Sequence, residues 1–275
     1  MISVVISAKD AESTIRLAVT SALVGLSSED EVLVLCDGCS DSTETVVRSI
    51  QDSRVRTFAV SESLGRSQGR NFLLDRAKSD FIAILDADDI CLPWRFSSTK
   101  RLLRKYDAVF STAVVFGRQL RPFRFLFQVP RQIKPIQMPI ECLGRNPLVH
   151  SSAAFRRESL DLVGDYRNSE AEEYDLWLRM LNSGARLYRA PLPWVMYRIH
   201  KGQASQVAGF VARGLSCHYV IQEQRSLAVT LGISAQSIEG IRSAAQEQVR
   251  TSGFWARLEV LGLAGLRGLL AFRGK

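Results

Sequence analysis

The stretch FIAILDADDICLPWR, residues 81–95, decides how this sequence is interpreted. Its first five residues are apolar and flanked by polar ones, which predicts a short buried strand. Three carboxylates, Asp86, Asp88 and Asp89, follow directly. Carboxylates that converge on one point repel one another unless a cation neutralises them. Because Mg²⁺ and Mn²⁺ bind carboxylate oxygens and bridge to phosphates, the stretch predicts a metal and diphosphate site. The alternative is an Asp-rich turn that caps the next helix.

Apolar strands alternate with helical patterns on the N-terminal side of this stretch. Strands are predicted at 2–7, 31–36, 54–60 and 81–85. Helices are predicted at 12–24 and 67–79, and a further helix follows the second strand, where Asp41 and Glu44 have the spacing of a capping box. This alternation predicts an α/β fold of parallel βαβ units, with helices on both faces of the sheet. Ligands of such sheets bind at the carboxyl ends of the strands, where Asp37 and the 86–89 cluster would lie.

The pattern becomes less regular after residue 116. Residues 117–147 contain several prolines and many basic residues, which predicts a long loop or an irregular insertion. A helix is predicted at 169–182, and residues 205–252 have mainly helical patterns. We therefore expect a first domain at 1–205 and a helical C-terminal extension at 206–275.

Composition limits the classes of protein to which the chain can belong. The 275 residues are 46% hydrophobic and 23% charged, which suits one sizeable α/β domain with a smaller appendage and excludes a disordered chain. The net charge of +8 favours anionic partners, but the basic segments contain no nucleic-acid recognition module, so no nucleic acid is expected. Five cysteines, an odd number, argue for reduced thiols in a reducing compartment. The N-terminus lacks a signal-like segment, which predicts a cytoplasmic protein.

Several motifs occur in order along the chain: SVVISAKDAESTIRLAVTSAL, CDGCSDST, LGRSQGRNFLLDRAKSDFIAILDADD, HSSAAFRRE and AEEYDLWLRM. Together they resemble the family 2 inverting glycosyltransferases of the GT-A fold over roughly residues 1–205. The resemblance implies a Rossmann-like, mostly parallel sheet flanked by helices. It also implies transfer of a sugar from a nucleotide-sugar, a UDP-sugar in most cases, to a hydroxyl group of a saccharide or lipid-linked acceptor in cell-envelope polysaccharide or glycolipid synthesis.

The same resemblance assigns roles to the donor-binding positions. Asp37 would read the nucleotide base, Asp86 would contact the ribose region, and Asp88 would bind Mn²⁺ or Mg²⁺ at the diphosphate. Arg70 would lie near the nucleotide. Ala8, with Lys9, would line the base pocket, where the sequence SAKD departs from the tyrosine–asparagine pair that is common in the family.

The segment AEEYDLWLRM, 171–180, matches the part of the family that supplies the catalytic base. The family usually has Glu-Asp here, whereas this chain has Glu172 and Glu173. Glu173 stands at the position of the base, and on a helix it shares a face with Trp177, which suggests that it points inward and has a raised pKa. Glu172 is assigned to substrate binding, and its alternative is a capping box with Ser169.

Two histidines stand at motif positions. His200, in YRIHKGQAS, either approaches the diphosphate and metal or is structural. His150 matches the motif HSS near the acceptor side. The implied mechanism is a single displacement in which the acceptor hydroxyl attacks the anomeric carbon and the nucleoside diphosphate leaves. No covalent intermediate is expected.

Two segments favour contact with a membrane surface. Residues 118–134 interleave arginines with phenylalanines, which fits a membrane-facing loop or a buried insertion. Residues 254–275 place leucines near one helical face and add positive charge, which fits an interfacial anchor; the alternative is a helix packed on the domain or on another subunit. The anchor would make the protein peripheral on the cytosolic face of the membrane.

Two other functions compete with sugar transfer. A catalytically inactive module that binds nucleotide-sugars would explain the exchange of the usual base for Glu173. A sugar-phosphate nucleotidyltransferase of the same fold would need a glycine-rich loop after the first strand, and SAKDAEST contains none.

Overall fold

The structure is a computed structural model that describes residues 1–117, 125–127, 130–200, 203 and 210–251. The predicted strands and helices of the first half are confirmed: β1 (Ser3–Ala8), α1 (Ile15–Val24), β2 (Glu31–Asp37), α2 (Thr43–Arg48), β3 (Val55–Val60), α3 (Arg66–Leu74) and β4 (Phe81–Ile84). Helix α3 ends five residues before the predicted position. The predicted anchor at 254–275 and residues 118–124 and 128–129 of the segment 118–134, predicted as a membrane-facing loop or a buried insertion, lie outside the described residues.

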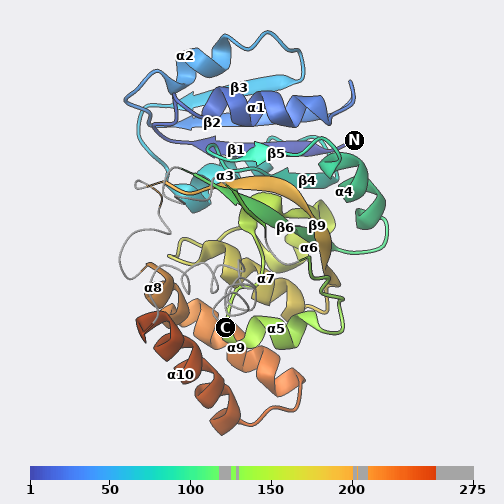
Figure 1. Ribbon diagram of the computed structural model, residues 1–275, viewed down its shortest axis with the longest axis vertical. Helices are drawn as coiled ribbons and strands as arrows, with labels where there is room; N and C mark the ends of the chain where they lie inside the picture. Colours follow the sequence, from blue (N-terminus) through green and yellow to red (C-terminus); the bar gives the residue numbers. More distant parts are fainter. Residues whose placement is uncertain (118–124, 128–129, 201–202, 204–209, 252–275) are drawn as a thin grey trace, which may run out of the picture.

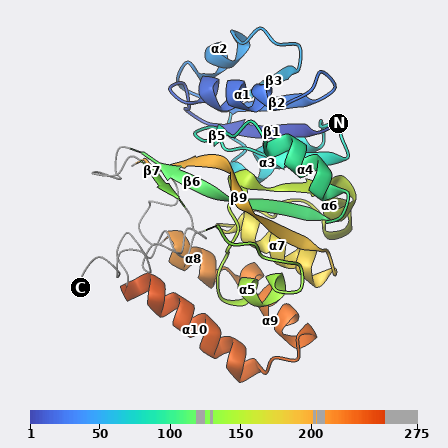
Figure 2. The ribbon, with the colours of Figure 1, turned by 45° about the vertical axis from the view of Figure 1, so that its right-hand side comes forward.

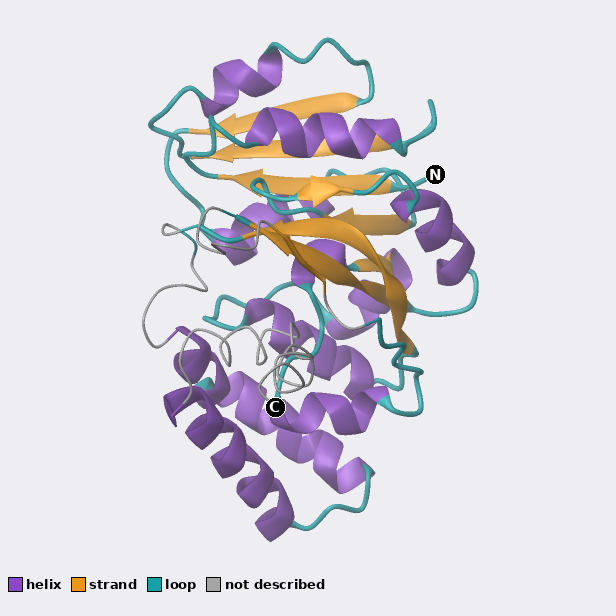
Figure 3. Cartoon of the chain, in the orientation of Figure 1, coloured by secondary structure: helices purple, strands orange, loops and turns teal. Residues whose placement is uncertain are grey.

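One sheet runs through the described part of the chain. Its later strands are β5 (Ile90–Cys91), β6 (Ala108–Phe116), β7 (Phe125–Phe127), β8 (Ala154–Arg156) and β9 (Leu187–Arg198). The strand order is β3-β2-β1-β4-β8-β6-β9-β5, with β7 beside β6 (Figure 1). The pairs from β3 to β4 are parallel, as predicted. Beyond β4 the sheet also contains antiparallel pairs, and it curls away from the first four strands (Figure 3).

The direction of the strands gives the sheet two functionally distinct edges. Strand β8 is antiparallel to β4, with Ala83 opposite Ala154, so the residues that precede β8 lie beside those that follow β4. Strands β6 and β9 run in the same direction as β4, because two antiparallel steps separate β6 from β4 and β9 is parallel to β6. We call the edge where β1, β2, β4 and β9 end the carboxyl edge. The opposite, amino edge carries the turns at 27–30, 104–107 and 183–186.

Both faces of the sheet are covered, as the near-continuous apolar strands predicted. In β2, Val32 and Val34 point to one face and Leu33 and Leu35 to the other, and all four are buried. The first face packs against α1 and α4 (Arg95–Leu103), and the second against α3 and α7 (Glu172–Asn182), while α9 (His218–Thr230) packs against α7. Trp177 of α7 is fully buried at the centre of the second face, with its ring 4.8 Å from that of Phe110.

The prediction of an irregular segment at 117–147 is wrong for residues 138–144, which form helix α5 (Met138–Gly144). Met138, Cys142 and Leu143 are buried, so the segment has an apolar face despite its prolines. Pro139 lies in the first turn, where its missing N–H costs no helical hydrogen bond. The remaining helices are α6 (Arg157–Val163), α8 (Phe210–Ser216) and α10 (Ala235–Thr251). Helices α5, α8, α9 and α10 form a layer on the far side of α7 from the first four strands (Figure 2).

One further sequence prediction concerns the thiols. All five cysteines are free, as predicted. Among the described residues, the longest helices are too short or too polar to cross a lipid bilayer.

Candidate active site

Asp86, the first carboxylate after β4, lies between the side chains of Arg70 and His150. Its Oδ1 is 3.6 Å from Arg70 Nη2 and 3.6 Å from His150 Nδ1, and its backbone N–H donates to Ser151 Oγ at 3.1 Å. Burial raises the pKa of Asp86, but His150 and Arg70 outweigh burial and lower it to about 2. The site therefore keeps this carboxylate ionised.

Asp88, the predicted metal ligand, contacts the predicted diphosphate residue His200. His200 Nε2 lies 2.8 Å from Asp88 Oδ2, and Arg198 Nε donates to the Asp88 carbonyl at 2.7 Å. Burial and the nearby Asp86 raise the pKa of Asp88, and His200 opposes that rise. The structure thus brings together two residues that are separated by more than one hundred positions in the sequence.

Asp89 completes the acidic cluster and is almost fully buried. Its Oδ1 accepts the backbone N–H of Arg198 at 2.8 Å, whereas its Oδ2 is buried and has no hydrogen-bond partner among the described residues. Burial, together with Asp88 and Asp86, raises the pKa of Asp89 well above its ordinary value. A divalent cation would neutralise these charges, but among the described residues the ligand atoms that converge within 4.8 Å belong to Asp10, Cys39 and Asp41 and not to this cluster, so a metal at Asp88 stays a prediction.

A second acidic group lies at the carboxyl ends of β1 and β2. Oxygens of Asp10 and Asp41 lie within 4.8 Å of each other and of Cys39 Sγ. Each carboxylate already has a local partner: Asp10 Oδ1 accepts the N–H of Ser40 at 2.7 Å, and Asp41 Oδ1 accepts the N–H of Thr43 at 2.9 Å. These contacts fasten two loops to each other and account for the acidic residues without a metal.

The predicted capping box of Asp41 and Glu44 is not formed. Asp41 bonds to Thr43 as just described, but Glu44 pairs with Arg48 at 2.7 Å instead of reaching back to the helix start. The i,i+4 spacing of Glu44 and Arg48 competes with the capping contact and is satisfied within α2.

Glu172 is buried and forms ion pairs with two arginines of α3. Its Oε1 accepts a hydrogen bond from Arg70 Nη1 at 2.8 Å, and its Oε2 lies 3.1 Å from Arg66 Nη2. The alternative capping box with Ser169 is therefore wrong: α7 begins at Glu172 itself, and Ser169 Oγ has no hydrogen-bond partner among the described residues. Glu172 holds Arg70 against Asp86, which places a positive charge beside the acidic cluster.

We expect Glu172→Gln to destabilise the fold and to weaken donor binding. The amide keeps one acceptor but removes the negative charge that faces two arginines, and the loss should be about 1–3 kcal/mol of unfolding free energy. Chemical denaturation of the variant measures it. Glu158→Gln is the matched control, because Glu158 pairs with Arg156 at 2.8 Å on the exposed surface. An equal, small effect of the two substitutions would contradict a positioning role for Glu172.

Glu173, the predicted base, follows Glu172 in the first turn of α7. The side chain is half-buried, and Trp177 and Met180 on the same face are fully buried, so it points inward as expected. Burial and the neighbouring Glu172 raise the pKa of Glu173, and His150 and Arg70 oppose the rise. No described residue forms a hydrogen bond or an ion pair with its carboxylate. A carboxylate with a raised pKa and no partner is available to accept a proton.

Asp37, the predicted base-reading residue, already accepts three hydrogen bonds from the loop before α3. They come from Ser63 Oγ at 3.0 Å and from the backbone N–H groups of Leu64 at 2.6 Å and Gly65 at 3.1 Å. Gly38 follows with φ of +60°, and a side chain there would collide with the backbone of Ser63. Asp37 thus fixes the shape of the loop at the carboxyl end of β2. Its contact with a base stays a prediction.

Ala8 and Lys9, which were predicted to line the base pocket, lie at the end of β1. Ala8 is buried, and its carbonyl accepts the thiol of Cys39 at 3.4 Å, while Lys9 is exposed. Both positions are at the carboxyl edge, close to Asp37 on the neighbouring strand.

Sequence reasoning missed Tyr166. Its hydroxyl lies 3.1 Å from His150 Nε2, and the Arg70 guanidinium lies 5.6 Å from the centre of its ring. Burial raises the pKa of Tyr166 far above neutrality, so the hydroxyl stays protonated. It therefore orients the imidazole of His150 toward Asp86. In the sequence, Tyr166 is marked only as an aromatic residue in GDYRN, 164–168, shortly before the segment 171–180 that contains the predicted base.

The curled α/β sheet flanked by helices is the GT-A-like fold of glycosyltransferases. S. aureus TarS 1-349 in complex with UDP-GlcNAc matches all of this chain and 76% of its own, with a TM-score of 0.68 and 13% identity. The mannosyltransferase PcManGT from Pyrobaculum calidifontis, in complex with GDP-Man and Mn²⁺, matches 99% and 81%, with a TM-score of 0.62 and 15% identity. At these identities the likeness concerns the fold alone.

The profile of the family described as Glycosyl transferase family 2 matches residues 3–164, and the chain belongs to this family. Among its relatives is the Escherichia coli UDP-Glc:alpha-D-GlcNAc-diphosphoundecaprenol beta-1,3-glucosyltransferase WfaP, 26% identical over 74% of this chain and 80% of the relative. Another is the succinoglycan biosynthesis protein ExoO of Rhizobium meliloti, 29% identical over 75% of this chain but only 63% of the relative. The amylovoran biosynthesis glycosyltransferase AmsE of Erwinia amylovora is 28% identical over 63% and 65%.

Proposed function

We propose that the chain transfers a sugar from a nucleoside diphosphate sugar, with UDP as the nucleotide, to a hydroxyl group of a saccharide or lipid-linked acceptor, with inversion at the anomeric carbon. The observation that carries the proposal is the carboxyl edge itself. Asp86 of the acidic cluster contacts His150 and Arg70, and the charges of the same two side chains act on Glu173, whose carboxylate has a raised pKa and pairs with no described residue. In a single displacement, a metal-binding carboxylate would help to stabilise the leaving diphosphate, and a carboxylate with a raised pKa would accept the proton of the attacking hydroxyl.

In this proposal Glu173 accepts the proton of the attacking hydroxyl, and no residue forms a covalent bond to the sugar. Arg70, held by Glu172, keeps a positive charge beside Asp86 on the donor side. Asp37 and Ala8 lie where the base would bind. The acceptor would approach from the side of Glu173 and His150.

Mn²⁺ or Mg²⁺ is proposed as the cofactor, held by Asp88 with the help of the acidic cluster. When bound, the ion would neutralise charge that develops on the leaving diphosphate. His200, which now contacts Asp88, would then be free to turn toward the phosphates. PcManGT supports the metal by analogy, because its structure contains Mn²⁺ with GDP-Man.

The relatives support an acceptor in envelope polysaccharide synthesis. The name of WfaP specifies a diphosphoundecaprenol acceptor, and those of ExoO and AmsE specify polysaccharide synthesis. A peripheral position on the cytosolic face of the membrane, through 254–275, would suit such a lipid-linked acceptor.

The test is a screen of UDP-, GDP- and dTDP-sugars against the purified chain, with Mn²⁺ or with EDTA. Calorimetry measures donor binding, and release of the nucleoside diphosphate measures turnover with undecaprenyl diphosphate-linked sugars. We expect metal-dependent binding of a UDP-sugar and turnover with acceptor. Binding without turnover for any donor and acceptor would favour the inactive binding module, and absence of binding would reject the proposal.

The raised pKa of Glu173 predicts the pH dependence of transfer. The base works only when it is deprotonated, so activity falls as the pH falls through its pKa, which lies above the ordinary value of 4.5. We expect kcat/KM, at saturating metal, to decline on the acid side as Glu173 is protonated, at a higher pH than an unperturbed glutamate would give. The residual activity of Glu173→Gln should lack this decline. A decline of the same shape in that variant would assign it to another group.

A further inference from the structure

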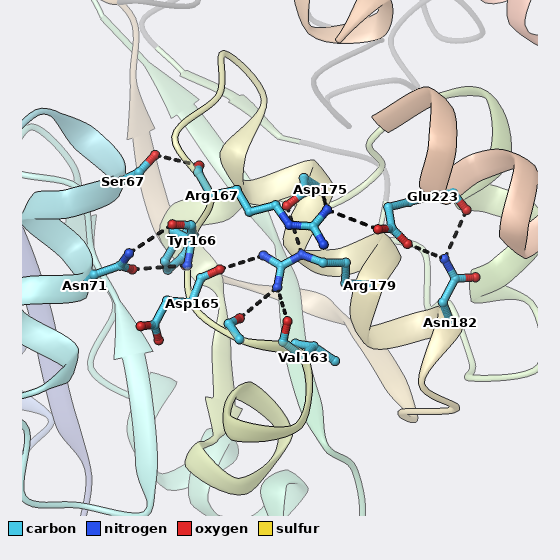
Figure 4. A network of polar contacts seen from close by, with 11 residues as sticks. Ser67, Asn71, Val163, Asp165, Tyr166, Arg167, Asp175, Arg179, Asn182 and Glu223 are labelled. Carbon is cyan, nitrogen blue, oxygen red and sulfur yellow. Dashed lines mark hydrogen bonds and ion pairs between the residues drawn. The ribbon is translucent and has the colours of Figure 1, made fainter. Parts of the chain in front are cut away.

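The loop between α6 and α7, residues 164–171, leads directly into the first turn of α7 that carries Glu173. A network of polar contacts surrounds this loop and connects three helices (Figure 4). Because catalytic geometry must hold to a fraction of an ångström, the parts that fix this loop also affect the rate of the proposed reaction.

Helix α3 fixes the first half of the loop. Asn71 Nδ2 donates to the Tyr166 carbonyl at 2.9 Å, and the N–H of Tyr166 donates to Asn71 Oδ1 at 3.1 Å. One turn earlier, Ser67 Oγ donates to the Arg167 carbonyl at 3.0 Å. The amide of Asn71 therefore pairs with the loop backbone as a neighbouring strand would (Figure 4).

Helix α7 fixes the start of the loop through Arg179. The guanidinium donates to the carbonyls of Val163, of Gly164 at 2.8 Å and of Asp165 at 2.7 Å, and its Nε donates to Asp175 Oδ2 at 2.9 Å. Both side chains are buried, which makes these contacts costly to break.

Helix α9 enters the network through a single arginine of the loop. Arg167 Nη1 lies 3.1 Å from Asp175 Oδ1 and 3.1 Å from Glu223 Oε1, and its guanidinium lies 5.1 Å from the centre of the Tyr219 ring. Glu223 is held on its other side by Asn182 Nδ2, which donates to Oε2 at 2.8 Å. Glu223 and Tyr219 belong to α9, and the family profile ends at residue 164, so this part of the network lies outside the matched region.

We infer that Arg167 and Glu223 are positioning residues for the proposed base, and that α9 of the C-terminal extension is part of the catalytic apparatus. The inference rests on the proposed function. Arg167 connects α9 to Asp175, which lies two residues after Glu173, and its neighbour Tyr166 orients His150. The ion pair thereby fixes both the first turn of α7 and the imidazole on the opposite side of the site.

The experiment compares Arg167→Gln, Glu223→Gln and the double variant in the full chain. We expect kcat to fall by about 10- to 100-fold with donor KM unchanged, the scale of a small misplacement of a catalytic group. The double variant should be no slower than the slower single variant, because the two side chains act as one unit. Arg167→Lys should recover part of the rate, since one nitrogen of Arg167 makes both contacts.

Glu239→Gln is the matched control, because Glu239 pairs with Arg225 of α9 at 2.7 Å and with Arg242 at 2.8 Å, and neither ion pair involves a residue of the loop. It should leave kcat unchanged. Amide hydrogen exchange of residues 164–175 provides a readout that does not need turnover: exchange should accelerate in Arg167→Gln and Glu223→Gln and not in Glu239→Gln. If the wild type transfers no sugar, the proposed function fails, and this exchange still decides whether Arg167 and Glu223 fix the loop and the first turn of α7. Unchanged exchange, or losses of kcat equal to that of the control, would overturn it.

Discussion

Glu173→Gln should lower sugar transfer by roughly 10²- to 10⁴-fold, the usual scale of general-base catalysis. The amide keeps the shape of the side chain but cannot accept a proton. No described residue pairs with the Glu173 carboxylate, so its neutralisation removes no ion pair and should leave the fold intact. Donor binding should persist, because the donor-side residues belong to β1, β2, α3 and β4. Single-turnover measurements with saturating donor and acceptor separate the chemical step from binding.

Glu173→Asp is the sharper variant, because it introduces the residue that is usual in the family and shortens the side chain by one methylene group. We expect partial activity, since the first turn of α7 is fixed by Glu172 and Asp175 around the longer glutamate. Full transfer by Glu173→Gln would remove Glu173 as the base. Equal losses of donor binding and of transfer in that variant would show that it acts on the donor instead.

Asp88→Ala should abolish metal-dependent donor binding. Loss of a residue that supports a ligand typically costs 10- to 100-fold in metal affinity, and loss of a direct ligand should cost roughly 10²-fold or more. The fold should survive, because removing the Asp88 carboxylate relieves repulsion from Asp86 and, among the described residues, takes a side-chain partner from His200 alone. Calorimetric titration with UDP in the presence and absence of Mn²⁺ measures the effect.

Asp10→Asn is the control for this experiment, because Asp10 belongs to the second acidic group at the ends of β1 and β2. Asparagine also tolerates the positive φ of +48° at this position. Mn²⁺-dependent binding should be retained in Asp10→Asn. Loss of binding in Asp10→Asn with retention in Asp88→Ala would move the metal to the other group.

The parallel half of the fold could be predicted from the sequence because it depends on local signals. Each strand from β1 to β4 is a short apolar run, and each helix between them has its own periodicity. The rule that strand ends meet at one edge then places Asp37 and Asp86 together without any knowledge of contacts. The ordered family motifs also assigned Glu173 and His200 to the site, although both residues lie far along the sequence from Asp37 and Asp86.

The contacts within the site could not be predicted in the same way. Capping-box spacing gave Ser169 as the alternative partner of Glu172 and paired Glu44 with Asp41, but in the structure both glutamates form ion pairs with arginines. The spacing of residues within one helix cannot predict an ion pair with an arginine of another helix, such as the pair between Glu172 of α7 and Arg70 of α3. Helix α5 was missed for a related reason, because its apolar face is stabilised by α9 and α10, which follow it by many residues.

The segregation of the sheet into two edges has a practical consequence. The residues assigned to chemistry gather at the carboxyl edge, whereas the turns at 27–30 and 183–186 lie at the amino edge, where Ser28 and Ser183 are exposed. A fluorophore or a surface tether attached at either serine would leave the donor and acceptor routes open. The protein can therefore be immobilised on a biosensor in a defined orientation, with its reactive side facing the liposomes or oligosaccharides that are passed over it.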